Sequence, residues 1–339
     1  MVAKEEITIS EAEAALYDRQ IRLWGLEAQK RLRAARVLLI GLGGLGAEIA
    51  KNLTLSGIKS LTLLDHNVAV ANSANFLVPR ELVGKNVVEA SLERVQRLNP
   101  MVEVIADQEN VSTKNEDFFS GFDVVCSTRL AVEESFRINS ICRKHSIPFY
   151  SGDVFGFTGF FFVDLLEHEY AEEVNVAPAP AADDACSLKT KADQSETKTV
   201  KHILNYIPLQ AAFEADAAAQ LNKRSWQRIK SHFIMMKSLL MFRSQMKRDP
   251  EVANRQSDIA KLCEIRDHIQ HEMKLDNQII DSCAYEVVFG ELSPGAAVVG
   301  GVLAQEIIKA VSHKDAPIRN HFFFNGATDF NGVVEAIGF

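Results

Sequence analysis

The sequence predicts an α/β protein built on a doubly wound, mainly parallel sheet, and three observations lead to this prediction. Short apolar segments that suit buried strands alternate with helical segments between residues 36 and 151, an order typical of βαβ units. A glycine-rich turn at 41–46 follows the first of these strands and precedes a helix. From 155 to 165 the chain is rich in Phe and Gly without an intervening helix, so we expect an antiparallel extension of the sheet.

The elements of the first half can be assigned in order from caps, glycines and apolar runs. Residues 10–35 are expected to be helical, because Ser10 and Glu13 match a capping box, and Gly25 is expected to interrupt this helix. The elements that follow are strand 36–40, helix 47–55 with Gly57 as its C-cap, strand 60–65, helix 81–98 before Asn99-Pro100, strands 102–106 and 122–126, helix 132–145 and strand 147–151.

The chain is expected to divide into four segments. They are 10–170, the first part of the sheet domain; 171–200, a flexible linker suggested by its prolines and polar residues; 201–283, a mainly helical insertion; and 284–339, which returns to the sheet domain. Pro294 opens the last helix, which is crowded with small residues. We therefore expect another element to pack very close to that helix, as at an interdomain or intersubunit contact.

Composition excludes several classes of protein. The net charge of −8 over 339 residues disfavours a nucleic-acid binder, which needs a basic face. Five cysteines without a Cys-x-x-Cys pair argue against a disulfide framework and a cysteine-rich zinc site, and they suggest a reducing compartment. The charged N-terminus lacks a signal region, and no uninterrupted apolar run approaches the roughly 20 residues of a membrane span. We expect no metal site in this chain.

The glycine turn has the spacing of a phosphate-binding fingerprint. Gly41, Gly43 and Gly46 would make the tight turn, admit a pyrophosphate to the backbone and let the helix pack on the sheet. Asp65 ends the second strand, where an acidic residue reads a ribose hydroxyl. The alternative is a tight strand-to-helix turn that binds no ligand.

Several longer motifs resemble the adenylation fold, itself Rossmann-like, of the ubiquitin-like-protein activating enzymes. These motifs are Tyr-Asp-Arg-Gln-Ile-Arg-Leu-Trp-Gly at 17–25, the glycine turn, Gly-Ile-Lys-Ser-Leu-Thr-Leu-Leu-Asp at 57–65, Leu-Asn-Pro at 98–100 and Ala-Val-Val-Gly-Gly-Val-Leu-Ala-Gln-Glu at 297–306. The resemblance covers roughly 10–165 and 284–337. Length and the stretch from Arg22 to Arg33 are most similar to the smaller subunits of SUMO-activating heterodimers.

The sequence departs from the active members of this family at the positions that carry charge. Their Asn-x-x-Arg-Gln-Phe segment corresponds to 66–76, where Asn72 and Asn75 remain but Arg and Gln are missing. Their lysine falls near Val87 and their late aspartate in 127–129, with Lys85 and Arg80 as the nearest cations. Adenylation needs Lys, Arg and Mg²⁺ to hold phosphate charge. The resemblance therefore implies that this chain binds no cofactor, that its glycines and Asp65 are vestigial, and that ATP and Mg²⁺ bind to a larger catalytic subunit.

Two further expectations follow from the resemblance. No cysteine has the family's Pro-x-Cys-Thr context, so Cys186 and Cys263 are expected to be incidental thiols. In the family, the arginine of the Tyr-x-Arg-Gln motif reaches the ATP held by the other subunit, which implies a catalytic role in trans for Arg19. Arg22 has a weaker claim to that role. The alternative is that Arg19 forms a salt bridge on its own helix.

The expected function is that of a regulatory and structural subunit in a SUMO-activating heterodimer. It would support adenylation of the modifier's C-terminus and thioester formation on the partner's cysteine, and the family implies a nuclear location, with the cytoplasm left open. Alternatives are an NAD-dependent oxidoreductase, a free-standing adenylyltransferase of the sulfur-carrier type, and a pure scaffold subunit for another ubiquitin-like modifier. The sulfur-carrier alternative needs charges and paired Cys-x-x-Cys motifs that are absent here.

Overall fold

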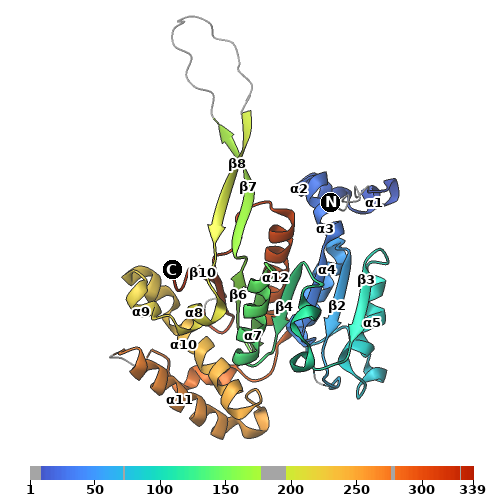
Figure 1. The fold of residues 1–339 in the computed structure, drawn as a ribbon. Coiled ribbons are helices and arrows are strands. Elements are labelled where there is room, and N and C mark those ends of the chain that lie inside the picture. The colour runs from blue at the N-terminus through green and yellow to red at the C-terminus, as the bar shows by residue number, and fades with distance from the viewer. Residues whose placement is uncertain (1–8, 72, 177–195, 276–278, 329) are drawn as a thin grey trace, which may run out of the picture.

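An eight-stranded mixed sheet forms the centre of the computed structural model, which describes residues 9–71, 73–176, 196–275, 279–328 and 330–339 (Figure 1). The strand order is β10-β9-β6-β5-β4-β1-β2-β3. The parallel part consists of β1 (Arg36–Ile40), β2 (Ser60–Leu64), β3 (Glu103–Asp107), β4 (Val124–Thr128) and β5 (Phe149–Phe155). The antiparallel extension consists of β6 (Thr158–Asp164), β9 (His321–Asn325) and β10 (Gly332–Glu335). The predicted doubly wound α/β fold and its antiparallel extension are confirmed.

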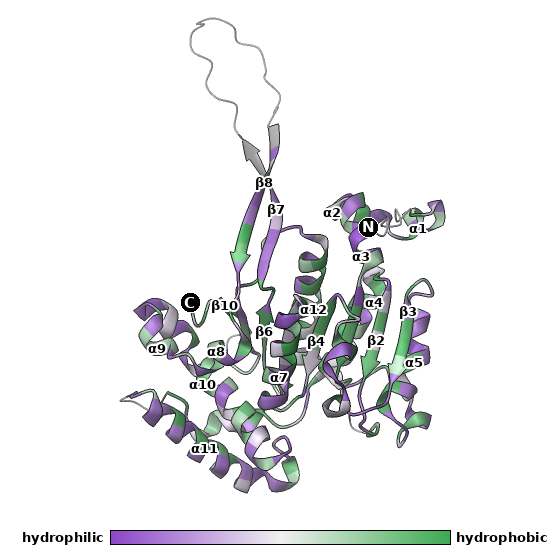
Figure 2. Cartoon of the chain, viewed as in Figure 1, coloured by the Kyte–Doolittle hydropathy of each residue, from purple (hydrophilic) through white to green (hydrophobic). Residues whose placement is uncertain are grey.

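The central strand β1 is apolar because both of its faces are covered. Val37 and Leu39 belong to the core beneath α4 (Gly44–Ser56), α5 (Val87–Leu98) and α12 (Ser293–Ser312). Leu38 and Ile40 face the opposite core, beneath α6 (Glu116–Phe119) and α7 (Val132–Lys144). A parallel strand buried on both faces has a continuous apolar sequence, and Figure 2 shows the neighbouring strand β2 largely in the hydrophobic colour.

The remaining helices lie at two ends of the sheet. The N-terminal helices are α1 (Glu11–Leu16), α2 (Asp18–Trp24) and α3 (Leu26–Ala34). The helical insertion contains α8 (Leu209–Glu214), α9 (Ala217–Gln220), α10 (Lys223–Met246) and α11 (Arg255–Glu272), of which α10 packs against β9 and β10. The predicted capping box of Ser10 and Glu13 is present, and Gly25 separates α2 from α3 at φ +89°. A second break, at Tyr17, was not predicted.

One predicted helix start and one predicted segment type are wrong. The helix predicted from 81 begins at Val87, because the Asn86 side chain caps it by accepting the amides of the next two residues. The described parts of the predicted linker are strands: β7 (Glu167–Val176) and β8 (Glu196–Asn205) form an antiparallel hairpin that extends from the body (Figure 1). Sequence alone does not reveal the hairpin, because pairing between two separate segments, which no local sequence pattern shows, defines it. Residues 177–195, with Pro178, Pro180 and Cys186, lie outside the described chain.

The last helix, α12, is closely packed as predicted, but its neighbour is α4 of the same chain. A β-carbon on Gly300 would lie 2.7 Å from the Glu48 Cβ. A β-carbon on the neighbouring Gly301 would meet no atom within 4 Å, and Val298 is 42% exposed. By length and composition α12 could cross a membrane, contrary to the expectation from sequence, but 61% of its apolar window is buried inside the protein, as in the core helix of a globular domain.

Candidate functional site

The glycine turn between β1 and α4 has the backbone geometry that its spacing predicts. Gly41 lies at φ +86°, a region that favours glycine, and a side chain there would collide with Thr128. Gly46, in the first turn of α4, lies directly against the backbone oxygen of Gly41. Both glycines are therefore needed for the strand–turn–helix packing, whether or not a ligand binds.

A carboxylate of the chain itself covers the N-terminus of α4. Glu291 lies just before α12, and its Oε2 and Oε1 accept the amides of Gly44 at 2.8 Å and Leu45 at 3.2 Å. The carboxylate rests against Gly43, where a β-carbon would lie 2.5 Å from Oε2. In a dinucleotide-binding turn the second glycine admits a pyrophosphate to the backbone. In this chain the same space admits Glu291.

Asp65 stands where a nucleotide-binding fold reads a ribose, and in this chain its side chain holds the glycine turn. Its Oδ2 accepts the amide of Leu42 at 2.8 Å, and its Oδ1 accepts the backbone and side-chain amides of Asn67 at 2.9 and 2.8 Å. The buried Asn75 donates to the carbonyl of Leu42 at 2.7 Å. Because both oxygens of Asp65 have partners within the chain, the geometry weighs against an oxidoreductase in which this carboxylate binds ribose.

Alternating charges continue from Glu291 into the interior. Arg129 Nη1 lies 3.7 Å from Glu291 Oε2, and Arg129 Nη2 lies 3.6 Å from Asp249 Oδ2. The buried Arg243 pairs with Asp249 at 2.5 Å and with the buried Asp153 at 2.8 Å. Arg129 is thus shared between two carboxylates, so a phosphate would have to compete with both for its guanidinium.

The other positions that would carry charge in an active member of the family do not supply it. Val87 is buried at the start of α5, and Thr128 is buried beside the glycine turn. Lys85 and Arg80 are exposed, and within the described chain neither side chain makes a hydrogen bond or ion pair. Asn72 lies outside the described residues.

Arg19 is exposed on α2, and its side chain has no hydrogen-bond or ion-pair partner in the part of the chain that the structure describes. Its neighbour Arg22 pairs with Asp18 on the same helix at 3.0 Å. The salt bridge on the helix's own face, which was the alternative role for Arg19, is therefore formed by Arg22. Leu16 and Leu23 lie nearby along the chain, at 59% and 71% exposure.

Several of the motifs that carry the family resemblance meet where α2 begins. The buried Tyr17 packs on Gly57, where a β-carbon would lie 2.5 Å from the ring atom Cζ. The Tyr17 hydroxyl accepts a hydrogen bond from Asn99 Nδ2 at 2.8 Å, and Gln20 Nε2 donates to the carbonyl of Leu55 at 3.2 Å. These contacts anchor α2 on the C-terminal end of α4 and leave Arg19 on the outer surface.

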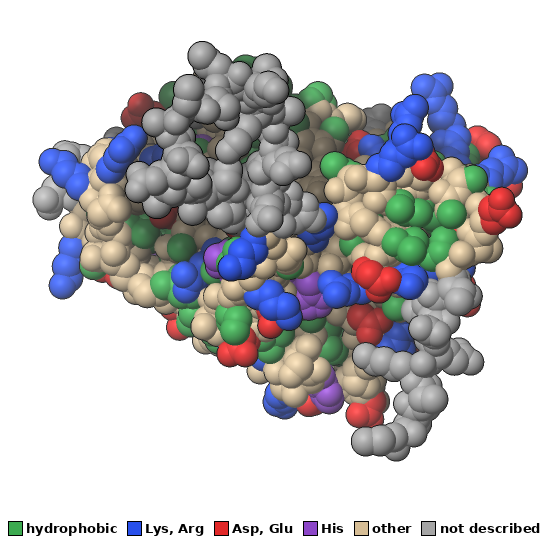
Figure 3. All heavy atoms as spheres, turned by 90° about the horizontal axis from the view of Figure 1, so that it is seen from above, with side chains coloured by type: hydrophobic (Ala, Val, Ile, Leu, Met, Phe, Trp, Pro, Cys, Tyr) green, Lys and Arg blue, Asp and Glu red, His purple; other side chains and the backbone are tan. Residues whose placement is uncertain are grey.

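Arg19 and the glycine turn belong to opposite ends of α4. The glycine turn lies at the N-terminus of this 13-residue helix, whereas α2 is anchored at its C-terminus. Such a helix is about 20 Å long, so Arg19 cannot serve the glycine turn of its own chain. Figure 3 views the end of the molecule with α2, where Lys and Arg side chains share the surface with hydrophobic ones.

Comparison with known proteins shows the family to which the chain belongs. The model of the ThiF family matches residues 17–336. The chain belongs to the ThiF family. It is 46% identical over 346 residues to the SUMO-activating enzyme subunit 1 of Xenopus tropicalis, covering 100% of this chain and 99% of that protein. The human protein of the same name matches with 46% identity over 345 residues and the same coverage, and that of Danio rerio with 46% over 340 residues, 98% of this chain and 97% of that protein.

A solved structure agrees with the fold of this ThiF-family chain. The crystal structure of SeMet PaaA matches with a TM-score of 0.56 at 17% identity, over 100% of this chain and 87% of that one. At this identity the likeness concerns the fold alone.

The thiols of this ThiF-family chain that the structure describes are not arranged as a nucleophilic site. Cys126 and Cys142 are buried, and burial raises the pKa of both, that of Cys142 to about 12. Cys263 is half-buried, Cys283 is exposed, and Cys186 lies outside the described residues. Among the residues described, no group of three or more His, Cys, Asp or Glu side chains could hold a metal ion.

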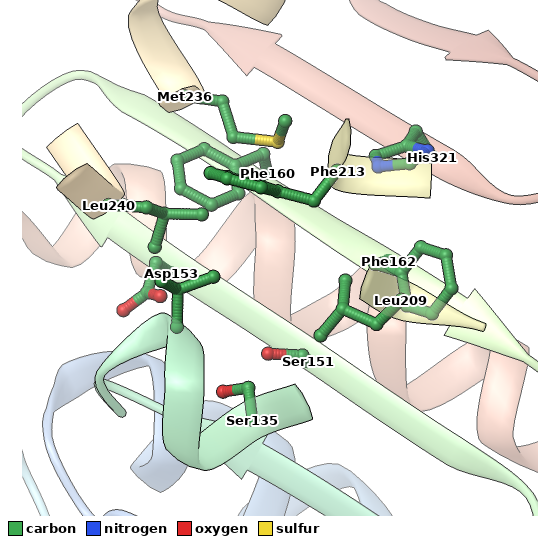
Figure 4. A pocket seen from close by; sticks show the side chains of 11 residues that line it. Ser135, Ser151, Asp153, Phe160, Phe162, Leu209, Phe213, Met236, Leu240 and His321 are labelled. Atoms are coloured by element: carbon green, nitrogen blue, oxygen red, sulfur yellow. The ribbon is translucent and has the colours of Figure 1, made fainter. Parts of the chain in front are cut away.

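The cavity in Figure 4 is a packing space beneath α7, α8 and α10. Its volume is about 20 Å³, which suits roughly one water molecule. Phe160, Phe162 and Leu209 line it together with the polar Ser151 and His321. Burial lowers the pKa of His321 to about 3, which keeps the ring neutral. The cavity is too small for a nucleotide.

Sequence reasoning missed the residues that close the glycine turn. Glu291 is separated from Gly44 by 247 positions, and Arg243 and Asp249 lie in the helical insertion. The one signal that could have pointed to Glu291 was its position just before the last helix of the sheet domain, whose small residues already predicted a close neighbour.

Proposed function

We propose that this chain is a subunit of a SUMO-activating enzyme and acts in a complex with a larger, catalytic subunit. It supports ATP-dependent adenylation of the modifier's C-terminus and thioester formation on the partner's cysteine. Full-length relatives at 46% identity that carry this name support the assignment. The assignment of ATP binding to the other subunit rests on one observation: the Glu291 carboxylate accepts the amides of Gly44 and Leu45. ATP and Mg²⁺ then bind to the partner, and this chain alone is inactive.

Arg19 is the residue through which this chain acts on the partner's ATP. Three observations support the role: its exposure, its lack of a partner among the described residues, and the anchoring of α2 through Tyr17 and Gln20. A guanidinium on a fixed helix at a subunit surface can stabilise phosphate charge in the other subunit, as an arginine finger does. The exposed Leu16 and Leu23 supply apolar area for the contact that brings the subunits together.

Reconstitution tests this function. The chain is co-expressed with candidate large subunits, purified as a complex, and assayed for thioester formation with SUMO, ubiquitin and other ubiquitin-like modifiers. We expect a thioester with SUMO that needs both subunits, and no ATP–pyrophosphate exchange by this chain alone. Exchange by the isolated chain, or a thioester on the large subunit that is as fast without this chain, would contradict the proposal.

A further inference from the structure

The glycine turn is blocked by a residue that is itself firmly held. Glu291 forms a parallel bridge with Gly156, and the Gly156 amide donates to the carbonyl of Gly290 at 2.5 Å. After Glu291, the next residue, Leu292, is already the N-cap of α12, and its carbonyl accepts the Ala296 amide at 2.9 Å. The β5–β6 turn and α12 therefore position the Glu291 side chain, so its contact with α4 is a built feature of the fold.

The contact is also the one that a phosphate group would make. The first amides of a helix lack partners within the helix and carry part of its positive dipole, so they attract anions. Glu291 accepts two of these amides, those of Gly44 and Leu45, and its side chain is only 10% exposed. The carboxylate lies on Gly43, whose missing side chain provides the space. A phosphate and the Glu291 carboxylate cannot occupy this space together.

The surroundings add repulsion to this steric block. Asp65 accepts the Leu42 amide within the turn, and Asp249 lies beside Arg129. The site therefore presents several carboxylates to an incoming anion, and the guanidinium of Arg129 already interacts with two of them.

We propose that Glu291 is an autoinhibitory contact: a tethered carboxylate that occupies the phosphate position of the glycine turn, beneath which the turn remains able to bind an anion. The missing Arg and Lys residues explain why this chain cannot adenylate a carboxylate, and Glu291 explains why it does not bind the phosphates at all. This inference deepens the proposed function, because it assigns the exclusion of nucleotide to one residue. It concerns this chain alone and needs no partner.

The test measures binding of inorganic pyrophosphate to the full-length chain by titration calorimetry. Glu291→Ala removes the carboxylate, and Glu291→Gln keeps its shape but removes its charge. Glu286→Ala is the matched control, since Glu286 lies five positions earlier and pairs with Arg255 at 2.6 Å, away from the glycine turn. Because two hydrogen bonds to a charged acceptor are involved, we expect Glu291→Ala to bind pyrophosphate at least about tenfold more tightly than wild type. Glu291→Gln should show a smaller gain, and Glu286→Ala none.

Hydrogen exchange locates the bound anion. In Glu291→Ala, pyrophosphate should slow exchange of the Gly44 and Leu45 amides, which lose their protein acceptor in this variant. If Glu291→Ala does not fold, as judged by circular dichroism, Glu291→Gln decides the question. Pyrophosphate binding that is equal in wild type and the folded variants, or that leaves these two amides unprotected, would overturn the proposal. Failure of the wild-type reconstituted complex to form a SUMO thioester would instead contradict the proposed function, so the two failures are distinguishable.

Discussion

Tyr17 fixes the helix that carries Arg19, so its removal should lower activity by releasing α2. The ring is 3% exposed and packs on Gly57, and the hydroxyl accepts the Asn99 side-chain amide at 2.8 Å. In Tyr17→Phe, Asn99 Nδ2 still donates to the carbonyl of Thr54 at 3.0 Å, so no buried donor loses every partner. The free energy of unfolding should then fall by about 0.5–1.5 kcal/mol. Tyr17→Ala also loses the buried ring, which costs about 3–5 kcal/mol.

Two assays separate the effects of these variants. Urea unfolding of the isolated chain measures stability, and ATP–pyrophosphate exchange by the reconstituted complex measures function. We expect Tyr17→Phe to keep near wild-type exchange, and Tyr17→Ala to lose exchange while α2 gains rapid amide hydrogen exchange. A Tyr17→Ala variant that costs less than about 1 kcal/mol, or that releases α2 without any loss of ATP–pyrophosphate exchange, would refute this reasoning.

Three further predictions concern the core and the thiols. Gly46→Ala forces a β-carbon against the Gly41 oxygen and should lower the free energy of unfolding by roughly 1–3 kcal/mol without nucleotide present; a neutral result in urea would show that the turn is not structural. Burial lowers the pKa of His321 from 6.5 to about 3, so below 6.5 the unfolded chain binds a proton that the folded chain does not. Stability should therefore fall as pH decreases from 6.5 towards 3, by up to about 1.36 kcal/mol per pH unit. His321→Phe should flatten this slope, and a slope that is the same in the variant as in wild type would show that His321 is not its source. The exposed Cys283 should be alkylated much faster than Cys142, whose thiol pKa is raised by burial to about 12. Cys283→Ser should leave thioester formation by the complex unchanged. Loss of thioester formation in this variant would show that a thiol of this chain takes part in the reaction.

Local patterns predicted those parts of the fold that are determined by neighbouring residues. The apolar run of β1, the tight turn at Gly41 and the C-cap at Gly57 each follow from a few adjacent positions. The start of α5 was missed because residues 80–82 form a 3₁₀ turn and Asn86 supplies the cap. The β7–β8 hairpin was missed because it is defined by cross-strand pairs such as Ala171 with Lys201, which no local pattern shows.

The candidate site was predictable only in part, for a related reason. The glycines of the turn and Arg19 lie in contiguous motifs, so their types and spacing were visible. The occupant of the turn, Glu291, reaches it through the three-dimensional packing of α12 on α4. The partners of Asp65 lie in its own loop and in the neighbouring glycine turn, and by sequence alone its carboxylate could equally have faced a ribose.

The most direct test of the account is the effect of Arg19→Ala on ATP–pyrophosphate exchange by the reconstituted complex. Arg22→Ala is the matched control, because Arg22 lies on the same helix and pairs with Asp18. We predict that Arg19→Ala slows exchange by about tenfold or more with the complex intact, since a charge supplied to the phosphates in trans contributes at least this much. Arg22→Ala should have little effect. An Arg19→Ala complex that assembles and exchanges at the wild-type rate would contradict the account and leave this chain as a scaffold.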